Sequence, residues 1–210
     1  MLPALKVLLT VLSGAAMCSV AAAHAVTRDM SPKCDEAQAL TEGTALCTAQ
    51  HGLLKLTYER ASGRIVVQAP TARKNVLETI PHPYDPARVG AENLIRWLPM
   101  KLQPYLAHGK LLYFSARRSS PGDGHGYCGA GAEISVTVVN LRPVPKVEGH
   151  VPVSSCLDNI ELAASSGSDL SPYTVRNGKL TIAFSAYPGR GHVVAQINDD
   201  LTGLDFLASP

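Results

Sequence analysis

The chain has 210 residues, and its 19 basic and 17 acidic side chains give a formal net charge of +2 at pH 7. A nearly neutral chain argues against nucleic acid or an anionic membrane surface as the main partner, since both select a clear excess of basic residues. Hydrophobic residues make up 46% of the sequence. This share excludes disorder along the whole chain and, at this length, favours one domain with a substantial core.

The first 25 residues have the organisation of a secretory signal peptide. Lys6 supplies the positive start, an apolar run covers 7–20, and Ala23-His24-Ala25 forms a small-x-small cleavage site. The apolar run is shorter than the roughly 20 residues that a membrane span needs. We therefore predict cleavage near Ala25, no integral membrane segment in the mature chain, and a single periplasmic or secreted β-rich domain over 26–210.

Four of the five cysteines remain after the signal is removed, an even number in a chain bound for an oxidising compartment. Four cysteines allow three pairings. We expect Cys34–Cys47 and Cys128–Cys156, because each pair joins neighbours in sequence and one pair falls in each half of the chain. In the chain-entropy model, disulfides that close loops of these lengths stabilise a fold by about 3 to 4 kcal/mol each.

The first half of the mature chain predicts one β-hairpin and short helices. The runs 53–58 and 64–68 are apolar and β-prone, and Ala61-Ser62-Gly63 between them forms a turn. Short helices are expected over 73–79 and 91–98, the second ending at a proline and carrying Trp97, the only tryptophan, as a core anchor. Prolines between these two segments favour an irregular connection.

The second half predicts strands separated by turns. The expected strands cover 110–116, 133–139, 159–162, 173–175, 180–184 and 192–197. Asn177-Gly178 is the preferred dipeptide of a type I′ hairpin turn. The fold class that follows is mainly β (β-rich α+β): an antiparallel sheet, sandwich or partly open barrel with one or two short helices and two disulfides. Period-two geometry places Ile134, Val136 and Val138 on one face of that sheet.

A glycine-rich segment over 119–131 separates two of the expected strands. A phosphate-binding loop is excluded, because the segment has no lysine and leads into a strand and not a helix. A zinc site built from His125, Cys128, His150 and Cys156 would have suitable donors, but their spacing matches no established zinc motif and export favours the disulfide. The sequence therefore predicts no metal and no cofactor.

The main enzymatic alternative is a cell-wall or peptide hydrolase that uses Cys128 as nucleophile and His192 as base. Gly191-His192-Val193-Val194 resembles the histidine strand of cell-wall cysteine peptidases, and the resemblance implies that pair of roles. Those enzymes place the cysteine at the start of a helix, where the thiolate is stabilised. Here Cys128 precedes an expected strand, and its use as a nucleophile would leave Cys156 without a partner.

The interpretation that we favour is a binding loop held by the Cys128–Cys156 disulfide, and the alternative is a solvated connection without a partner. The candidate contact residues are Arg117, Arg118, Asp123, His125 and Tyr127. Arg and Tyr are enriched at protein interfaces, and loops on rigid scaffolds commonly carry recognition. We therefore expect an exported bacterial envelope protein that binds another protein, an envelope-directed enzyme or toxin, in the manner of an inhibitor or immunity protein.

Overall fold

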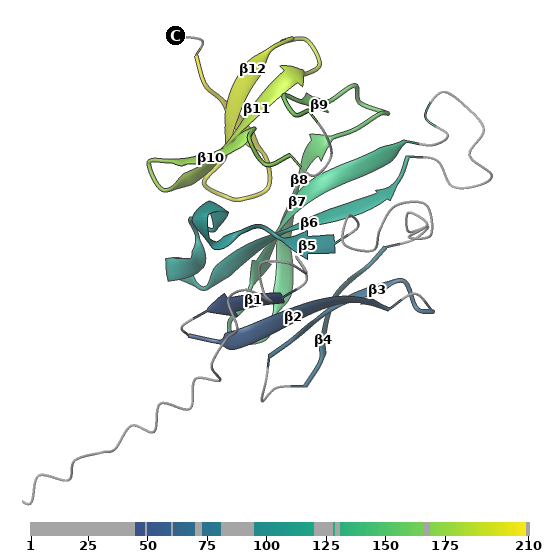
Figure 1. Cartoon of the computed structure of the whole chain (residues 1–210), viewed down its shortest axis with the longest axis vertical. Coiled ribbons are helices and arrows are strands. Elements are labelled where there is room, and N and C mark those ends of the chain that lie inside the picture. Colours follow the sequence, from purple (N-terminus) through teal and green to yellow (C-terminus); the bar gives the residue numbers. More distant parts are fainter. Residues whose placement is uncertain are drawn as a thin grey trace, which may run out of the picture. The chain divides into compact units, whose positions relative to one another are not determined.

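The computed structural model describes residues 45–48, 50–59, 61–69, 73–80, 95–119, 128, 131–165 and 169–208. All of them belong to one compact unit, Ser31–Pro210. These residues form three antiparallel β-sheets, and none of the sheets closes into a barrel (Figure 1). The prediction of a mainly β, antiparallel fold is confirmed.

The three sheets follow one another along the chain. The N-terminal sheet has the order β1 (Ala45–Thr48), β2 (Gly52–Glu59), β3 (Arg64–Gln68) and β4 (Asn75–Thr79). The central sheet has the order β5 (Ile95–Trp97), β6 (Lys110–Arg118), β7 (Ala132–Asn140) and β8 (Lys146–Ser154). The C-terminal sheet has the order β10 (Tyr173–Arg176), β11 (Lys179–Ala186), β12 (Val193–Ile197) and β13 (Leu204–Phe206), with β9 (Glu161–Leu162) also paired to β11.

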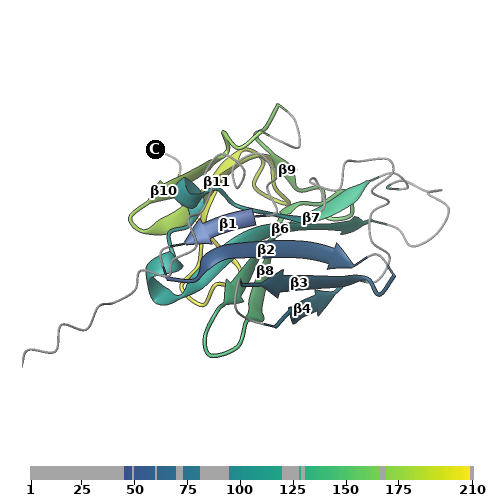
Figure 2. The ribbon, with the colours of Figure 1, turned by 60° about the horizontal axis from the view of Figure 1, so that its bottom comes forward.

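The central sheet is covered on both faces. Leu111 and Tyr113 of β6 pack with the N-terminal sheet, whereas Leu112 and Phe114 pack with the C-terminal sheet. Successive side chains of a strand point to opposite faces, so a fully apolar run is what a strand buried on both sides requires. Figure 2 shows β2, β3 and β4 lying over the central strands on one of these faces.

Two separate hydrophobic cores result from this arrangement. The core beneath the N-terminal sheet includes Ile65 and Trp97, and the ring of Trp97 meets Tyr113 edge-on with centroids 5.8 Å apart. The core beneath the C-terminal sheet includes Val136 and Val138, and Ile134 packs against it. The predicted common face of these three β7 residues is confirmed, as is the role of Trp97 as a core residue.

The face of the central sheet that looks toward the N-terminal sheet changes character along its strands. Leu111 and Tyr113 give way to Ser115 and Arg117 along β6. The cross-strand partners on β7 change in the same direction, since Val139 pairs with Leu111 while Glu133 pairs with Arg117. One end of this face is therefore hydrophobic and the other end is polar.

Several sequence predictions are wrong in the described residues. The helix expected over 73–79 is strand β4, and the described part of the helix expected over 91–98 is strand β5. Periodicity in short apolar runs does not separate the two structures, and here pairing with a neighbouring strand decides the outcome. The helices of the described part are the single 3-10 turns η2 (Met100–Leu102) and η3 (Leu106–His108).

The sheet predicted from four strands is also divided differently. The expected strands 110–116 and 133–139 lie in the central sheet, while 180–184 and 192–197 lie in the C-terminal sheet. One disulfide has both of its cysteines among the described residues, Cys128–Cys156, as predicted. Cys34 and the predicted signal peptide 1–25 lie outside the described residues, so the Cys34–Cys47 pairing and the cleavage site stay predictions.

Candidate functional site

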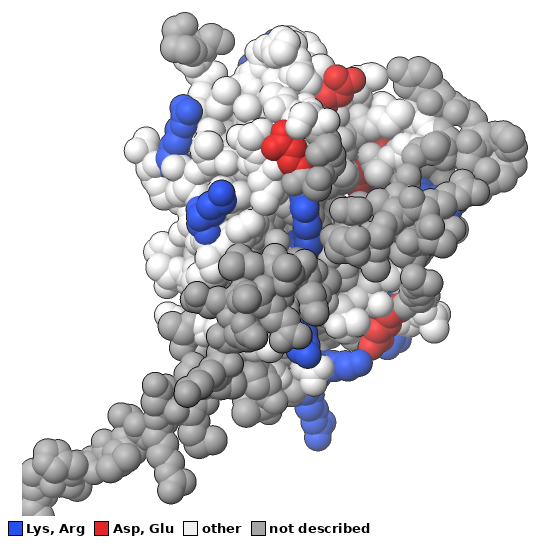
Figure 3. Space-filling view, viewed as in Figure 1, with Lys and Arg blue, Asp and Glu red and all other residues white. Residues whose placement is uncertain are grey.

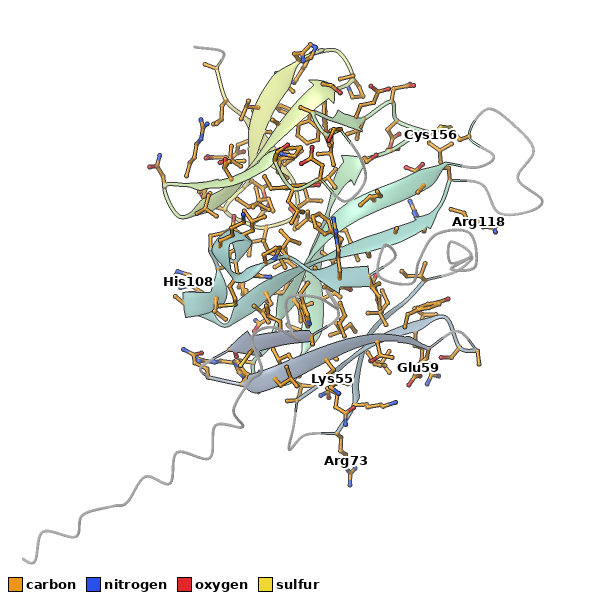
Figure 4. The ribbon with its side chains drawn as sticks, in the orientation of Figure 1. Lys55, Glu59, Arg73, His108, Arg118 and Cys156 are labelled. Carbon is orange, nitrogen blue, oxygen red and sulfur yellow. A yellow bond between two sulfur atoms is a disulfide. The ribbon has the colours of Figure 1, made fainter. Side chains whose placement is uncertain are left out.

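The predicted contact residues begin at the end of β6. Arg117 and Arg118 are its last two residues and point to opposite faces of the sheet. Figure 4 shows Arg118 and Cys156 at the same end of the central sheet. Asp123, His125 and Tyr127 lie outside the described residues, so the structure places two of the five candidates.

The glycine-rich segment is anchored to the central sheet at its C-terminal end. Cys128 is bonded to Cys156, which follows β8, and is itself buried. The backbone N–H of Gly131 donates to the Cys128 carbonyl over 2.9 Å, and the N–H of Ser119 donates to the Gly131 carbonyl over 3.1 Å. A Cβ at Gly131 would lie 2.9 Å from the Ser119 hydroxyl oxygen and 3.0 Å from Cβ of Cys156, so any larger residue would force its neighbours to shift.

A buried carboxylate completes this junction. The hydroxyl of Ser119 donates to Oε1 of Glu133 over 2.5 Å, and the backbone N–H of Leu157 approaches the same oxygen at 3.4 Å. Burial raises the pKa of Glu133, but hydrogen bonds from Ser119, Ser155 and Leu157 lower it more, so the net pKa lies below its ordinary value. Glu133 is therefore a structural acceptor that holds the turn at Cys156 to β7.

A cavity of about 330 Å³ opens beside this junction, between β4 and the polar end of the central sheet. Its polar lining residues come from four strands: Glu78, Thr79, Ser115, Arg117, Glu133, Ser135 and His150. Ser115 and Ser135 are cross-strand partners, as are Arg117 and Glu133. The floor of the cavity is thus the polar end of the central sheet, and β4 supplies a wall.

A chain of polar contacts links the cavity to the core. The Tyr113 hydroxyl donates to Oε1 of Glu78, whose Oε2 lies 3.5 Å from Nε2 of His150. Nδ1 of His150 lies 3.1 Å from the Thr137 hydroxyl oxygen, and that oxygen lies 2.9 Å from the hydroxyl oxygen of Ser115. Burial and the Glu78 carboxylate raise the pKa of Tyr113 far above its ordinary value, so the phenol stays protonated.

This chain is not arranged as a nucleophile with its base. The hydroxyl closest to His150 belongs to Thr137, which is fully buried, and Ser115 in the cavity contacts Thr137 and not the imidazole. Nucleophilic catalysis needs the base within hydrogen-bond reach of a group that substrate can approach. The network instead fixes the orientation of Glu78 and His150 at the cavity.

The structure also bears on the Cys128 alternatives. A cysteine nucleophile or zinc ligand must be a thiolate, and the sulfurs of Cys128 and Cys156 are bonded to each other. His192 is exposed in the turn between β11 and β12. Among the described residues, no group of three His, Cys, Asp or Glu side chains is placed to hold a metal ion.

The described surface carries both signs of charge. Acidic and basic side chains are both spread over the face drawn in Figure 3. Ion pairs among the described residues include Lys110 with Glu148 at 2.7 Å and Lys179 with Asp199 at 2.6 Å. No helix in the described part of the chain is long and apolar enough to cross a membrane.

Comparison with known proteins gives no relative. The chain matches no protein-family model, no curated protein and no solved structure at a significant level.

Sequence reasoning missed most of the cavity. It did not select Glu78, Ser115 or Ser135, and it considered His150 only as a metal ligand. A signal for part of the site is present, because polar residues replace apolar ones at every second position toward the end of β6 and the start of β7. The contribution of Glu78 had no such signal, since it depends on how two sheets pack.

Proposed function

We propose that this protein is an exported bacterial envelope protein that acts by binding another protein, as an inhibitor or immunity protein does toward an envelope-directed enzyme or toxin. The interface is assigned to the end of β6 and the segment between β6 and β7, with Arg117, Arg118, Asp123, His125 and Tyr127 as the contact residues. Periplasmic or secreted location, with a signal peptide cleaved near Ala25, is part of the same proposal.

The Cys128–Cys156 disulfide is the observation that carries this proposal. It fixes the return of a glycine-rich segment onto a sheet that is packed on both faces. Recognition loops on rigid scaffolds lose less conformational entropy on binding than free loops do. A disulfide also supports an oxidising compartment, because thiols in the cytosol are kept reduced.

The disulfide weighs against the hydrolase alternative as well. The nucleophile of that alternative is Cys128, whose sulfur is occupied. In the chain of polar contacts from Tyr113 to Ser115, the hydroxyl that contacts His150 belongs to Thr137, which is fully buried and closed to a substrate. Binding is therefore the function that the geometry supports best.

The proposal is tested by identifying the partner and then removing the disulfide. Chemical cross-linking of the mature protein in an envelope extract, followed by mass spectrometry, identifies candidates, and each purified candidate is assayed for stoichiometric inhibition. The double variant Cys128→Ser, Cys156→Ser should bind the identified partner more weakly, while Arg176→Ala, on the exposed end of β10, should bind as the wild type does.

Both variants are compared at a temperature at which circular dichroism shows that they are folded, since loss of the disulfide itself costs about 3 to 4 kcal/mol of stability. Wild-type affinity in the folded double variant would contradict the assigned interface. Turnover of peptidoglycan or peptides by the wild type, lost in Cys128→Ser alone, would replace binding by catalysis.

A further inference from the structure

We propose that the cavity between β4 and β6–β8 binds a small zwitterionic ligand of the size of a dipeptide, with its carboxylate on Arg117 and its ammonium group on Glu78. This site is lined by residues of three adjacent strands and of β4, and it shares Arg117 with the proposed protein interface. Its ligand is defined by charge, hydrogen-bonding capacity and size.

The charges of the cavity favour a ligand that carries both signs. Glu78 and Glu133 contribute two negative charges and Arg117 one positive charge, with His150 as a further polar group. A simple anion would meet two carboxylates, and a simple cation would meet the guanidinium group. A zwitterion can place its ammonium group near a carboxylate of the cavity and its own carboxylate near the guanidinium group.

The hydrogen bonds within the site determine which of these charged side chains can contact a ligand. Oε1 of Glu133 already accepts from Ser119 and from the backbone at Leu157. Arg117 has no ion pair within the described part of the chain, and a guanidinium group has five N–H donors and pairs well with a carboxylate. The carboxylate of the ligand is therefore assigned to Arg117.

Glu78 is the acceptor for the ammonium group of the ligand. The Tyr113 hydroxyl and the imidazole of His150 each approach one of its oxygens, and its side chain is 17% exposed. A carboxylate has about four lone-pair positions, so these two contacts leave acceptor capacity on both oxygens. Because the carboxylate is held by both neighbours, it is oriented before the ligand arrives, which reduces the entropy lost on binding.

The dimensions limit the ligand to a small molecule. Sites for small ligands span roughly 300 to 1,000 Å³, and the value of about 330 Å³ lies at the lower limit. The hydroxyl groups of Ser115 and Ser135 on the floor add hydrogen-bonding positions between the two charged groups. A dipeptide with free ends has its charges at its two ends and one polar peptide group between them, which matches the order of the groups in this lining.

The test is isothermal titration calorimetry with L-alanyl-L-alanine, its N-acetyl derivative and its C-terminal amide. The uncapped dipeptide should bind, and each capped form should bind about tenfold more weakly, the effect of one lost charge-assisted contact. In Arg117→Gln the uncapped and amidated dipeptides should bind equally. In Glu78→Gln the uncapped and acetylated dipeptides should bind equally, and the amide oxygen still accepts from Tyr113.

Arg176→Gln and Glu161→Gln, on exposed positions of the C-terminal sheet, are the matched controls and should retain the wild-type preference. The capped ligands test the wild type itself, so the proposal does not depend on any variant folding. Absence of binding by the uncapped dipeptide at millimolar concentration, or equal affinity for all three ligands in the wild type, would overturn it. Neither result would affect inhibition of an identified protein partner.

Discussion

The side-chain amide of Gln103 pairs with Leu112 as a neighbouring strand would. Oε1 accepts from the backbone N–H of Leu112 over 2.8 Å, while Nε2 donates to the carbonyl of Leu112 over 2.8 Å and to that of Leu98 over 2.7 Å. β5 ends at Trp97, and beyond it the Leu98 N–H still donates to the Leu112 carbonyl over 3.0 Å, while the Leu112 N–H depends on Gln103. One buried side chain therefore completes the edge of the central sheet.

Replacing Gln103 by alanine should lower the free energy of unfolding by about 2 to 4 kcal/mol. The substitution removes the partner of the Leu112 N–H and of the Leu98 carbonyl, whereas the Leu112 carbonyl still accepts from the Leu98 N–H. Each buried group left without a partner costs about 1 to 3 kcal/mol. Urea unfolding followed by circular dichroism measures the change. Gln68→Ala, exposed at the end of β3, should stay within about 0.5 kcal/mol of the wild type. A Gln103→Ala variant as stable as that control would show that water replaces the amide.

Gly149 of β8 lies directly against the turn between β12 and β13. A Cβ at this position would overlap the carbonyl oxygen of Leu201, a buried residue with a positive φ of 63°. Gly149→Ala should therefore lower stability by about 3 kcal/mol, because backbone and not a flexible side chain must move. In Gly203→Ala the nearest atom belongs to the Asn198 amide at 3.2 Å, so the loss should be smaller. Equal melting temperatures would show that the turn adjusts freely.

A substitution at Val136 tests whether the face of the central sheet that packs with the C-terminal sheet is buried. Its side chain is fully buried in the core with Val138 and Val151. Val136→Asp should cost at least about 4 kcal/mol, since it places an unpaired charge in a hydrophobic environment. The control Val144→Asp lies in the β7–β8 turn and is 59% exposed, so it should have little effect. Wild-type stability in Val136→Asp would mean that the strand is not packed as described.

The lowered pKa of Glu133 predicts how the stability of the fold depends on pH. Its pKa is lowered in the folded protein, so its stabilising contribution is complete above the pKa of an unfolded glutamate, about 4.3, and is lost as pH falls through the lower native value. Glu133→Gln should therefore lose less stability than the wild type between about pH 6 and about pH 3. Glu148 also has a lowered pKa, so the acid sensitivity should shrink without vanishing.

The measurement is the free energy of unfolding by urea at both pH values. Glu161→Gln, exposed on β9, leaves the contacts of Glu133 with Ser119 intact and should retain the acid sensitivity of the wild type. An identical pH dependence in Glu133→Gln and the wild type would show that the carboxylate does not contribute through its charge.

The strands that could be predicted are those in which local propensity and tertiary environment agree. β7 is rich in β-branched residues, and Asn177 and Gly178 both have positive φ, as the type I′ hairpin turn requires. β8 was not predicted, because Gly149 and Pro152 interrupt a sequence that is otherwise an alternating strand. In the structure, Gly149 packs closely against the backbone at Leu201. The glycine that makes this strand hard to predict from sequence is therefore needed for the packing of the fold.

The layered arrangement and the cavity depend on contacts that local sequence does not specify. Four consecutive apolar residues from Leu111 to Phe114 are typical of a strand buried on both faces, but they do not say which strands cover it. Glu78 and His150 are far apart in the sequence and belong to different sheets. Their contact exists only because β4 lies against β8, which no periodicity predicts.

The most direct test of the proposed function is the dissociation constant of the identified partner for a triple variant, Arg118→Ala, His125→Ala, Tyr127→Ala. Binding should weaken by about 3 kcal/mol or more, which is over a hundredfold in Kd, because a few Arg and aromatic residues dominate most interfaces. Thermal stability should change little, since surface substitutions usually matter by about 0.5 kcal/mol or less each. A folded triple variant that binds its partner with the wild-type Kd would contradict the assignment of the interface to the end of β6 and the segment between β6 and β7.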